Sequence, residues 1–522
     1  MVLAGLMLGV LVAALDQTVV GTAMPKIIAS LGGMTLYSWT FTAYMLSSTS
    51  MVPIFGKLSD IYGRRRFFLL GIIVFMVGSW LSGISQTMEQ LIIFRGIQGV
   101  GAAAIMPIAL AAIADIFPPA QRSRIQGLMA GVWGVASILG PLMGGYIADN
   151  LSWRWVFYVN IPVGILSIAV VYFNLHDRPH PNVKRKVDYP GVVLLLSGLL
   201  PLLLALSLGG KDYAWDSPTI IGLFLVAAVM LVLFPIVESR AEEPLIPLAL
   251  FRNSIFTVSV INGFLIGVSI FGAMVFLPLF LQAVGGASAT SSGLMLTPMM
   301  LAMMGTSALG GYLMSRIGYR KIALVSMATM VFGFYLVATM DAHSTGQQAM
   351  LYMVIAGLGM GPTMPLFLIA VQNSVEYSRL GVATSAIQFF RSVGGTVGVT
   401  VLGALLASSL DGQIRQQAGG SLSAITGGAR GLAEAQSLLD PAALARIPAP
   451  VLAILREALA SSLHEVFAVS VAVLAVAFMA TLFLKEVPLK RSFDRGPARK
   501  GTVEEGRPDL AMIGGAADPP EE

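Results

Sequence analysis

Long apolar runs alternate with short polar segments along almost the whole chain. Each run has roughly 18 to 25 residues, the length that an α-helix needs to cross the hydrocarbon core of a bilayer. The pattern predicts fourteen membrane-spanning helices, at about residues 3–24, 38–56, 67–85, 92–115, 125–147, 154–175, 188–208, 217–237, 254–280, 293–314, 321–340, 348–372, 381–407 and 464–484. We therefore expect an all-α integral membrane protein, whose first helix is retained rather than cleaved as a signal peptide.

Three segments interrupt this pattern and are not expected to span the membrane. Residues 176–187, HDRPHPNVKRKV, form a basic linker after the sixth run. Residues 408–463 form an Ala-, Gly- and Leu-rich external stretch with amphipathic character. Residues 485–522 form a polar tail with Gly and Pro, which we expect to be disordered.

A short charged turn between two apolar runs occurs twice. The first copy is GKLSDIYGRRRFFL, residues 56–69, and the second is GYLMSRIGYRK, residues 311–321. Five residues of the second copy are in register with five of the first: Gly311, Leu313, Gly318, Arg320 and Lys321 with Gly56, Leu58, Gly63, Arg65 and Arg66. The first glycine lets two helices approach closely, and the second permits a positive φ. The repeat predicts two related six-helix bundles, 1–175 and 254–484, with two additional helices, 188–237, inserted between them.

Composition supports a membrane protein and excludes several other classes. Of the 522 residues, 56% are hydrophobic and only 11% are charged, whereas a soluble domain has about 25% charged residues. The absence of cysteine excludes disulfides and thiolate chemistry. The four histidines lie outside or at the margin of the apolar runs, so we expect no metal site. The sequence also has no GxxxxGK(S/T) loop for a nucleotide, so an enzyme is the least favoured class.

The basic residues are concentrated in alternate loops. If the N-terminus is cytoplasmic, about 23 of the 32 Lys and Arg lie in cytoplasmic loops and the C-terminal tail, and about 7 lie outside. This asymmetry predicts a multi-pass protein of the cytoplasmic membrane with both termini in the cytoplasm. It also accounts for the formal net charge of +5 without a nucleic-acid partner.

Three charged residues are predicted inside the membrane, where an ionised group is costly and usually functional. Asp16 lies in LDQTVVGTAMPKI, Arg95 precedes Gln98 in RGIQGVGAA, and Arg391 follows Gln388 on the thirteenth run. Asp16 is either a carrier of protons or cationic substrate, or a structural aspartate bonded to a neighbouring helix. Arg95 either tunes that acid or joins helices. Arg391 either faces a cavity or lies where helices pack closely.

Gly131, Pro141 and Gly145 share one face of the fifth run, and Gly140 and Gly144 lie beside it. Gly131, Gly140, Gly144 and Gly145 allow close helix packing, and Pro141 removes one backbone hydrogen bond. The run is therefore either a packing surface or a hinge on which the helix rocks. Other residues that we expect as possible cavity groups are Tyr44, Trp133, Asn262, Gln282, Gln372 and Asn373.

Together these segments resemble the major facilitator superfamily, and in particular its fourteen-helix drug:proton antiporters. Residues 56–66 resemble the loop motif between helices two and three, and residues 95–103 resemble the fourth-helix motif implicated in proton transfer. ASILGPLMGG, residues 136–145, is similar to the fifth-helix motif typical of exporters. LDQTVVGTAMP and WRWVFYVNIPVG resemble the first-helix motif and the start of the sixth helix, and the face around Arg391 matches the late motif of that group.

The resemblance implies that Asp60, Arg64 and Asp115 form a cytoplasmic charge cluster that stabilises the outward-facing state. The loop motif between helices two and three, which we call the switch loop, also contains Gly56, Gly63 and Arg65. The family usually has a basic residue after the aspartate, but this chain has Ile61 there. Several members of the family that export doubly charged organic cations have a further acidic residue around the tenth helix. This chain has no acidic residue between 252 and 316, so the resemblance makes such cations less expected as substrates.

We therefore expect a proton-coupled exporter that moves amphipathic, cationic or neutral organic compounds outward by alternating access. Asp16 would be the proton or cation site, protons would be the coupling ion, and no other cofactor is expected. The protein would work as a monomer in contact with membrane lipid, and whether it recruits a periplasmic adaptor stays open. Two alternatives are an exporter of a single metabolite, peptide or lipid precursor, and a non-transporting receptor or assembly partner on the same fold.

Overall fold

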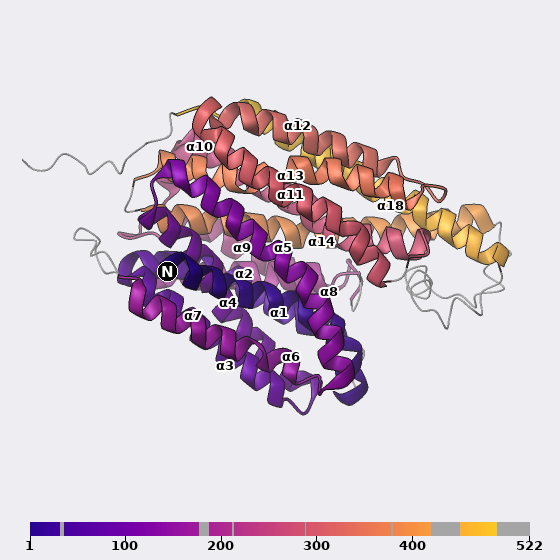
Figure 1. Ribbon diagram of the computed structural model, residues 1–522, viewed down its shortest axis with the longest axis horizontal. Coiled ribbons are helices and arrows are strands. Elements are labelled where there is room, and N and C mark those ends of the chain that lie inside the picture. Colours follow the sequence, from indigo (N-terminus) through magenta and orange to yellow (C-terminus); the bar gives the residue numbers. More distant parts are fainter. Residues whose placement is uncertain are drawn as a thin grey trace, which may run out of the picture.

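The computed structural model describes residues 1–31, 36–176, 187–210, 213–287, 289–376, 379–418 and 449–487. Its secondary structure over these residues is helical, apart from one isolated β-bridge between Gly209 and Tyr213 (Figure 1). The helices of the first half are α1 (Val2–Leu31), α2 (Tyr37–Tyr62), α3 (Arg64–Ile84), α4 (Met88–Ile116), α5 (Pro119–Asn150), α6 (Trp155–Tyr158) and α7 (Asn160–Asn174). They are followed by α8 (Tyr189–Leu208), α9 (Pro218–Glu238), η2 (Leu248–Arg252), α10 (Ser254–Leu279), η3 (Phe280–Val284), α11 (Ala289–Ile317), α12 (Tyr319–Ala338), α13 (Gly346–Ser374), α14 (Leu380–Ala418) and α18 (Ala449–Leu482).

In the described ranges, 12 helical segments are long and apolar enough to cross a membrane. The short α6 and α7 together supply one of them, Trp155–Asn174. Two further helices, α2 with 26 residues and α5 with 32, have sufficient length, although their polar and glycine residues make them less apolar. Each of the fourteen predicted spans coincides with one of these elements, so the predicted all-α membrane fold is confirmed.

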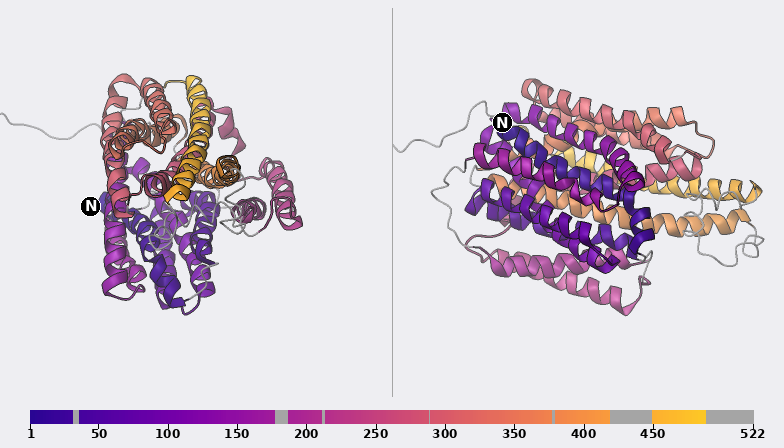
Figure 2. Two further views of the ribbon diagram at one scale, coloured as in Figure 1. Left: turned by 90° about the vertical axis from the view of Figure 1, so that its right-hand side faces the viewer. Right: turned by 60° about the horizontal axis from the view of Figure 1, so that its bottom comes forward.

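The helices form two bundles (Figures 1 and 2), and the helix contacts within one bundle correspond to those within the other. In the first bundle, α1 packs against α5 and α7, and α4 packs against α2 and α3. In the second, α10 packs against α14 and α18, and α13 packs against α11 and α12. Each helix thus has a counterpart in the same place of the other bundle, which is the arrangement that the repeated turn predicts.

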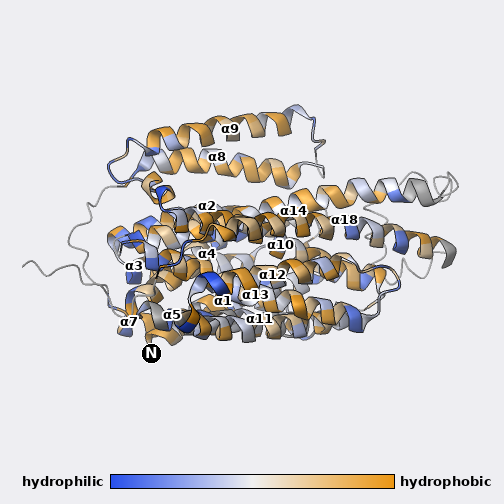
Figure 3. Ribbon diagram, turned by 90° about the horizontal axis from the view of Figure 1, so that it is seen from above, coloured by the Kyte–Doolittle hydropathy of each residue, from blue (hydrophilic) through white to orange (hydrophobic). Residues whose placement is uncertain are grey.

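The pair α8–α9 corresponds to the predicted insertion 188–237. The two helices pack against each other, and α8 also contacts α2 and α14. They lie beside the two bundles rather than in either of them (Figure 2), and both are apolar along most of their length (Figure 3). The insertion therefore adds a membrane-facing layer on one side of the molecule.

The two copies of the charged turn adopt the backbone conformation that the sequence predicts. Gly63, between α2 and α3, has φ 106°, and Gly318, between α11 and α12, has φ 86°. Residues with a Cβ atom rarely adopt such angles, which explains the glycine at both positions. Both turns lie at one end of the molecule, which we call the basic end.

The two bundles touch near the basic end and separate toward the opposite end. A methyl group built on Gly127 of α5 would lie 3.0 Å from Cα of Ala308 on α11. The same construction gives 3.4 Å at Gly131 and 3.9 Å at Gly134, both to Sδ of Met304, and no atom within 4 Å at Gly145. These glycines share one face of α5, because 18 residues make five helical turns. The space between α5 and α11 therefore widens away from the basic end.

The last two predicted spans are longer than expected. α14 continues to Ala418, and α18 begins at Ala449, so the helical structure extends into the predicted external stretch 408–463. Both helices project beyond the rest of the molecule (Figure 1). The remainder of that stretch lies outside the described residues, as do most of the predicted linker 176–187 and tail 485–522.

Candidate functional site

Asp16 and Arg95, two of the predicted intramembrane charges, form a buried ion pair. Nη1 of Arg95 on α4 donates to Oδ2 of Asp16 on α1 over 2.5 Å. The exposed fractions of the two residues are 0% for Asp16 and 1% for Arg95. Gln98, one turn after Arg95, accepts from Nη1 of Arg95 at 2.8 Å and donates to Oδ1 of Asp16 at 2.9 Å. The three residues thus close a hydrogen-bonded ring.

Asn160, which was not predicted as a site residue, completes the surroundings of Asp16. Its Nδ2 donates to Oδ1 of Asp16 and to Oγ of Ser79, each over 3.0 Å. Ser79 in turn donates to the carbonyl oxygen of Phe157 at 2.8 Å. Asn160 begins α7 directly after the break that separates α6 from α7. The only signal in the sequence is a single amide within WRWVFYVNIPVG.

Tyr44 on α2 lies against the other side of Arg95. The guanidinium carbon of Arg95 is 4.4 Å from the centre of the Tyr44 ring, a cation–π contact. Five helices therefore contribute to one site: α1, α2, α4, the start of α7 and, through Ser79, α3. Because the ion pair is buried, loss of one partner would leave an uncompensated charge, which costs about 3–5 kcal/mol.

The glycines of the exporter-like motif hold α5 against the helix that carries Asp16. Gly140 faces the side chain of Thr18, and Gly144 faces Thr22 and the backbone of Val19. The Thr18 hydroxyl also donates to the carbonyl oxygen of Ala136 on α5 at 3.1 Å. Of the other predicted hinge residues, Gly131 faces α11, Gly145 faces open space, and the side chain of Pro141 lies outside the described part. α5 therefore contacts both the Asp16 helix and the second bundle.

The predicted charge cluster of the switch loop is assembled at the basic end. Arg64 forms an ion pair with Asp60 and donates through Nε to Oδ2 of Asp115 at 3.0 Å. Oδ2 of Asp60 accepts from the backbone N–H of Val382 in the first turn of α14, at 2.8 Å. This hydrogen bond joins the first bundle to the second, and Gly56 of α2 lies against Ser385 of α14 beside it.

Two other basic residues of the same region have separate partners. Lys57 donates to Oε2 of Glu243, after α9, at 2.8 Å, which joins the α8–α9 pair to α2. The guanidinium carbon of Arg65 lies 4.4 Å from the ring centre of Tyr172 on α7. Neither contact follows from the motif.

Arg391 differs from Arg95 in having no acidic partner. Among the described residues no carboxylate oxygen lies within 4.0 Å of it, and no hydrogen bond to its side chain is formed. On the same helix face, Thr384 accepts from Nε2 of Gln372 on α13 at 3.1 Å, and Gln388 is 6% exposed. The structure thus places three predicted polar residues, Gln372, Gln388 and Arg391, on or beside one face of α14.

The remaining predicted cavity residues have contacts of their own. Asn262 donates to the carbonyl oxygen of Val258 and accepts from Thr481 of α18, so its amide joins α10 to α18. Gln282 donates to Ser292 near the end opposite the basic end. Asn373 donates to the carbonyl oxygen of Val487 over 3.4 Å, and Trp133 packs among apolar residues of the first bundle.

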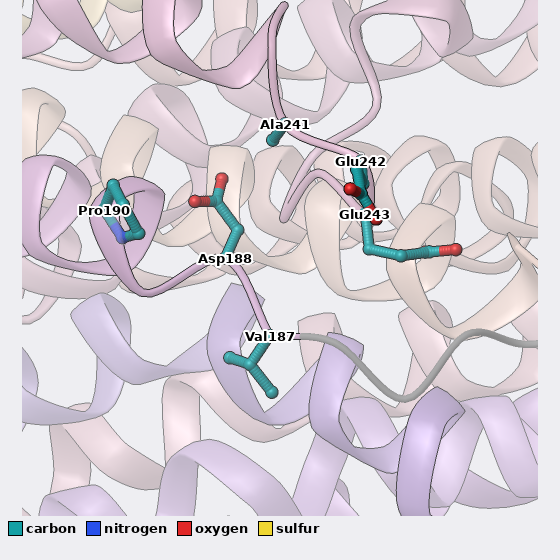
Figure 4. Close-up of a pocket in the computed structure, with 6 residues that line it drawn as sticks. All are labelled: Val187, Asp188, Pro190, Ala241, Glu242 and Glu243. Atoms are coloured by element: carbon teal, nitrogen blue, oxygen red, sulfur yellow. The ribbon is translucent and has the colours of Figure 1, made fainter.

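A cavity of about 210 Å³ lies between the segments that flank the α8–α9 pair. Its lining residues are Val187, Asp188, Pro190, Ala241, Glu242 and Glu243 (Figure 4). Glu238, whose carboxylate accepts from the backbone N–H of Ile246 at 2.6 Å, lies close by. Despite these acidic residues, no group of three or more potential ligands in the described part of the chain could hold a metal ion.

Comparison with known proteins gives consistent results. The family model described as Major Facilitator Superfamily matches residues 6–399. The chain is 42% identical over 508 residues to the multidrug transporter protein MdtP of Bacillus subtilis, covering 94% of this chain and 93% of that protein. It is 39% identical over 490 residues to multidrug resistance protein 3 of the same species, with coverages of 94% and 96%.

Solved structures share the fold at low sequence identity. The human organic anion transporter MFSD10 superposes with a TM-score of 0.61 and 14% identity, covering 92% of this chain and 98% of that chain. The proton:xylose symporter XylE gives a TM-score of 0.58 with 13% identity, covering 93% and 95%. These two likenesses concern the fold alone.

Proposed function

This chain belongs to the major facilitator superfamily, and we propose that it is a proton-coupled exporter of amphipathic organic compounds. Two relatives that are similar over nearly their whole length are named multidrug transporter protein and multidrug resistance protein, which supports efflux of drug-like molecules. The observation that carries the proton-coupling part is the buried ion pair of Asp16 and Arg95. In this proposal no cofactor besides the proton is needed, and one chain is the working unit.

Asp16 has the surroundings of a proton carrier whose charge is tied to helix positions. As a carboxylate it accepts from Arg95, Gln98 and Asn160, which come from two other helices. A bound proton would remove the negative charge and weaken all three hydrogen bonds, because bonds to ionised acceptors are roughly twice as strong as neutral ones. Protonation would therefore loosen α1 from α4 and α7.

The change at Asp16 can reach the second bundle through α5. The turn after Asp16 carries Thr18 and Thr22, which pack directly on Gly140 and Gly144 of α5. The other face of α5 contacts α11 at Gly127 and Gly131. A shift of α1 would thus alter the angle between the bundles, and this angle decides which end of the space between them is open.

The orientation in the membrane is part of the proposal. The basic end carries the arginine-rich turns after Gly63 and Gly318, and basic loops favour the cytoplasmic side. Both termini would then be cytoplasmic, in the cytoplasmic membrane. With the bundles in contact at this end through Asp60 and Val382, the described conformation corresponds to the outward-facing state.

The test is substrate-driven proton release from proteoliposomes that contain Asp16→Asn. We expect release to be lost, because an amide cannot exchange protons at this site, whereas Asp216→Asn, a change of an exposed aspartate, leaves it intact. The Asn variant leaves Arg95 without a charged partner, so the double variant Asp16→Asn/Arg95→Gln, without either charge, serves as a second measurement. Proton release at the wild-type rate in both would refute the assigned role.

A panel of chemically unrelated compounds in the same proteoliposomes addresses the breadth of specificity. Flux of several classes under an imposed pH gradient supports a multidrug exporter. Flux of a single metabolite, peptide or lipid precursor favours the narrow alternative. No flux of any compound, or flux that only nucleotide hydrolysis drives, would refute proton-coupled export.

A further inference from the structure

Arg391 lies deep in the membrane. It follows the first residue of the α14 span, Leu380–Leu410, by eleven positions. At 1.5 Å per residue this places it roughly 16 Å from the basic end, about halfway across a hydrocarbon core about 30 Å thick. An ionised side chain at such a depth is costly unless a partner or water compensates it.

The face of α14 that carries Arg391 is turned into the protein and not toward lipid. Thr384, two turns before, bonds to Gln372 of α13. Gly395, one turn after, lies against the ring of Phe271 of α10, and the backbone of Arg391 itself lies against Gly267. Arg391 nevertheless keeps a partly exposed side chain. Because this face of α14 is turned toward α10 and α13, the exposed part of the Arg391 side chain faces the interior of the protein and not the lipid.

No group of the described chain compensates this charge. Arg95 is neutralised by Asp16, but Arg391 has neither a carboxylate within 4.0 Å nor a hydrogen-bond acceptor among the described residues. Gln388, one turn away on the same face, is 6% exposed, and its amide also has no partner there. Two adjacent donors are thus available, and the membrane interior carries one net positive charge.

We propose that Arg391, assisted by Gln388, binds an anionic group of the transported compound, such as a carboxylate or a phosphate. A guanidinium presents paired N–H groups that match the two oxygens of such an anion, and the bond is strengthened by both charges. An amide N–H from Gln388 adds a third donor. The same face lies beside the apolar surfaces of α10 and α13, which suit the rest of an amphipathic molecule.

This inference rests on the proposed export function and narrows its substrate class to include amphipathic acids and zwitterions. Asp16 does not select a cation in the described state, because Arg95, Gln98 and Asn160 already occupy its oxygens. The charge that remains available to a substrate among these residues is the positive charge of Arg391. The exporter is therefore expected to prefer an acidic compound to its uncharged analogue.

The test uses two fluorescent probes that differ only in charge, dansyl-leucine and its carboxamide, with purified protein in nanodiscs of phosphatidylcholine. We expect the wild-type protein to bind the carboxylate at least about tenfold more tightly. Arg391→Gln should abolish this preference while leaving the affinity for the carboxamide unchanged, and Arg391→Lys should restore part of it. Arg316→Gln, which changes an exposed arginine of the same bundle, should behave as wild type.

Carboxamide binding reports whether each variant is folded, so a misfolded protein is recognised. Equal affinity of the wild-type protein for both probes would overturn the proposal, as would equal losses for both probes in folded Arg391→Gln. Proton release driven by the carboxamide, measured in proteoliposomes, separates this result from the proposed function. If release persists while the charge preference is absent, only the present inference fails. If neither probe drives release or flux, export itself fails.

A second arm identifies the source of the anion. Nanodiscs that also contain phosphatidylglycerol offer an anionic lipid headgroup at high local concentration. Competition by this lipid against dansyl-leucine, lost in Arg391→Gln, would assign the site to a lipid phosphate. Absence of competition, with the charge preference kept, would assign it to the acidic group of the substrate.

Discussion

Removal of the Asp60 charge tests how firmly the two bundles are joined at the basic end. Asp60→Asn keeps the shape of the side chain but weakens the hydrogen bond that it accepts from the Val382 N–H at 2.8 Å. The ion pair with Arg64 lies within the first bundle, so its loss affects both conformations alike. Only the bond to Val382 crosses to the second bundle. Of the hydrogen bonds and ion pairs that Asp60 forms, this one alone joins the two bundles, so the effect of Asp60→Asn on their equilibrium comes from it.

The magnitude follows from this one contact. A hydrogen bond to a charged group contributes about 1.5–3 kcal/mol, and each 1.4 kcal/mol is about a factor of ten in population. The Asn oxygen still accepts a bond roughly half as strong, so we expect Asp60→Asn to shift the equilibrium roughly three- to tenfold toward the state with the basic end open. The close contact of Gly56 with Ser385 remains, so the smaller value is the better expectation.

The assay is a distance measurement between spin labels on the two bundles. The chain has no cysteine, so labels at Gln121→Cys on α5 and Ile317→Cys on α11 need no prior replacement. Both positions are exposed at the basic end. We expect the distance distribution to move to longer values in Asp60→Asn but not in Asp216→Asn. Unchanged distributions in both would refute the reasoning.

Three further predictions concern the site and its supports. Gly144→Val should abolish transport, because a Cβ atom there meets the backbone of the Asp16 helix, whereas Gly145→Val, with no atom within 4 Å of the Cβ position, should transport normally; flux assays compare the two. Asn160→Ala removes the amide that donates to both Asp16 and Ser79 and so loosens α7 from α1 and α3; transport should fall, which flux assays against Asn174→Ala, a change outside this network, would show. A double-mutant cycle on Lys57 and Glu243, followed by thermal unfolding, should give a coupling of about 1 kcal/mol or less, because the pair is partly exposed.

Much of the fold could be predicted because its determinants are local. The length of each apolar run decides whether a helix can cross the bilayer, and neighbouring residues decide where Gly63 and Gly318 turn the chain. The ends of α14 and α18 were not predicted, because an Ala-rich amphipathic sequence forms a helix equally well in the bilayer and beyond it. The sequence gives no boundary there.

The site was predictable only in part, because it depends on which helices become neighbours. Asp16 and Arg95 were found individually, since charges are rare in apolar runs, but their pairing is a property of the packing of α1 on α4. Asn160 and Ser79 are ordinary polar residues whose position matters only after α7 and α3 meet α1. Likewise, helical periodicity places Gly131 and Gly140 on opposite faces of α5, but it does not say that one face meets α11 and the other α1.

The position of the α8–α9 pair makes the two sides of the molecule unequal for a compound dissolved in the lipid. α8 contacts both α2 and α14 and so covers that seam between the bundles. The other seam, between α5 and α11, opens progressively from Gly127 to Gly145. An apolar compound that diffuses in the bilayer leaflet farther from the basic end would thus reach the space between the bundles more easily between α5 and α11 than between α2 and α14.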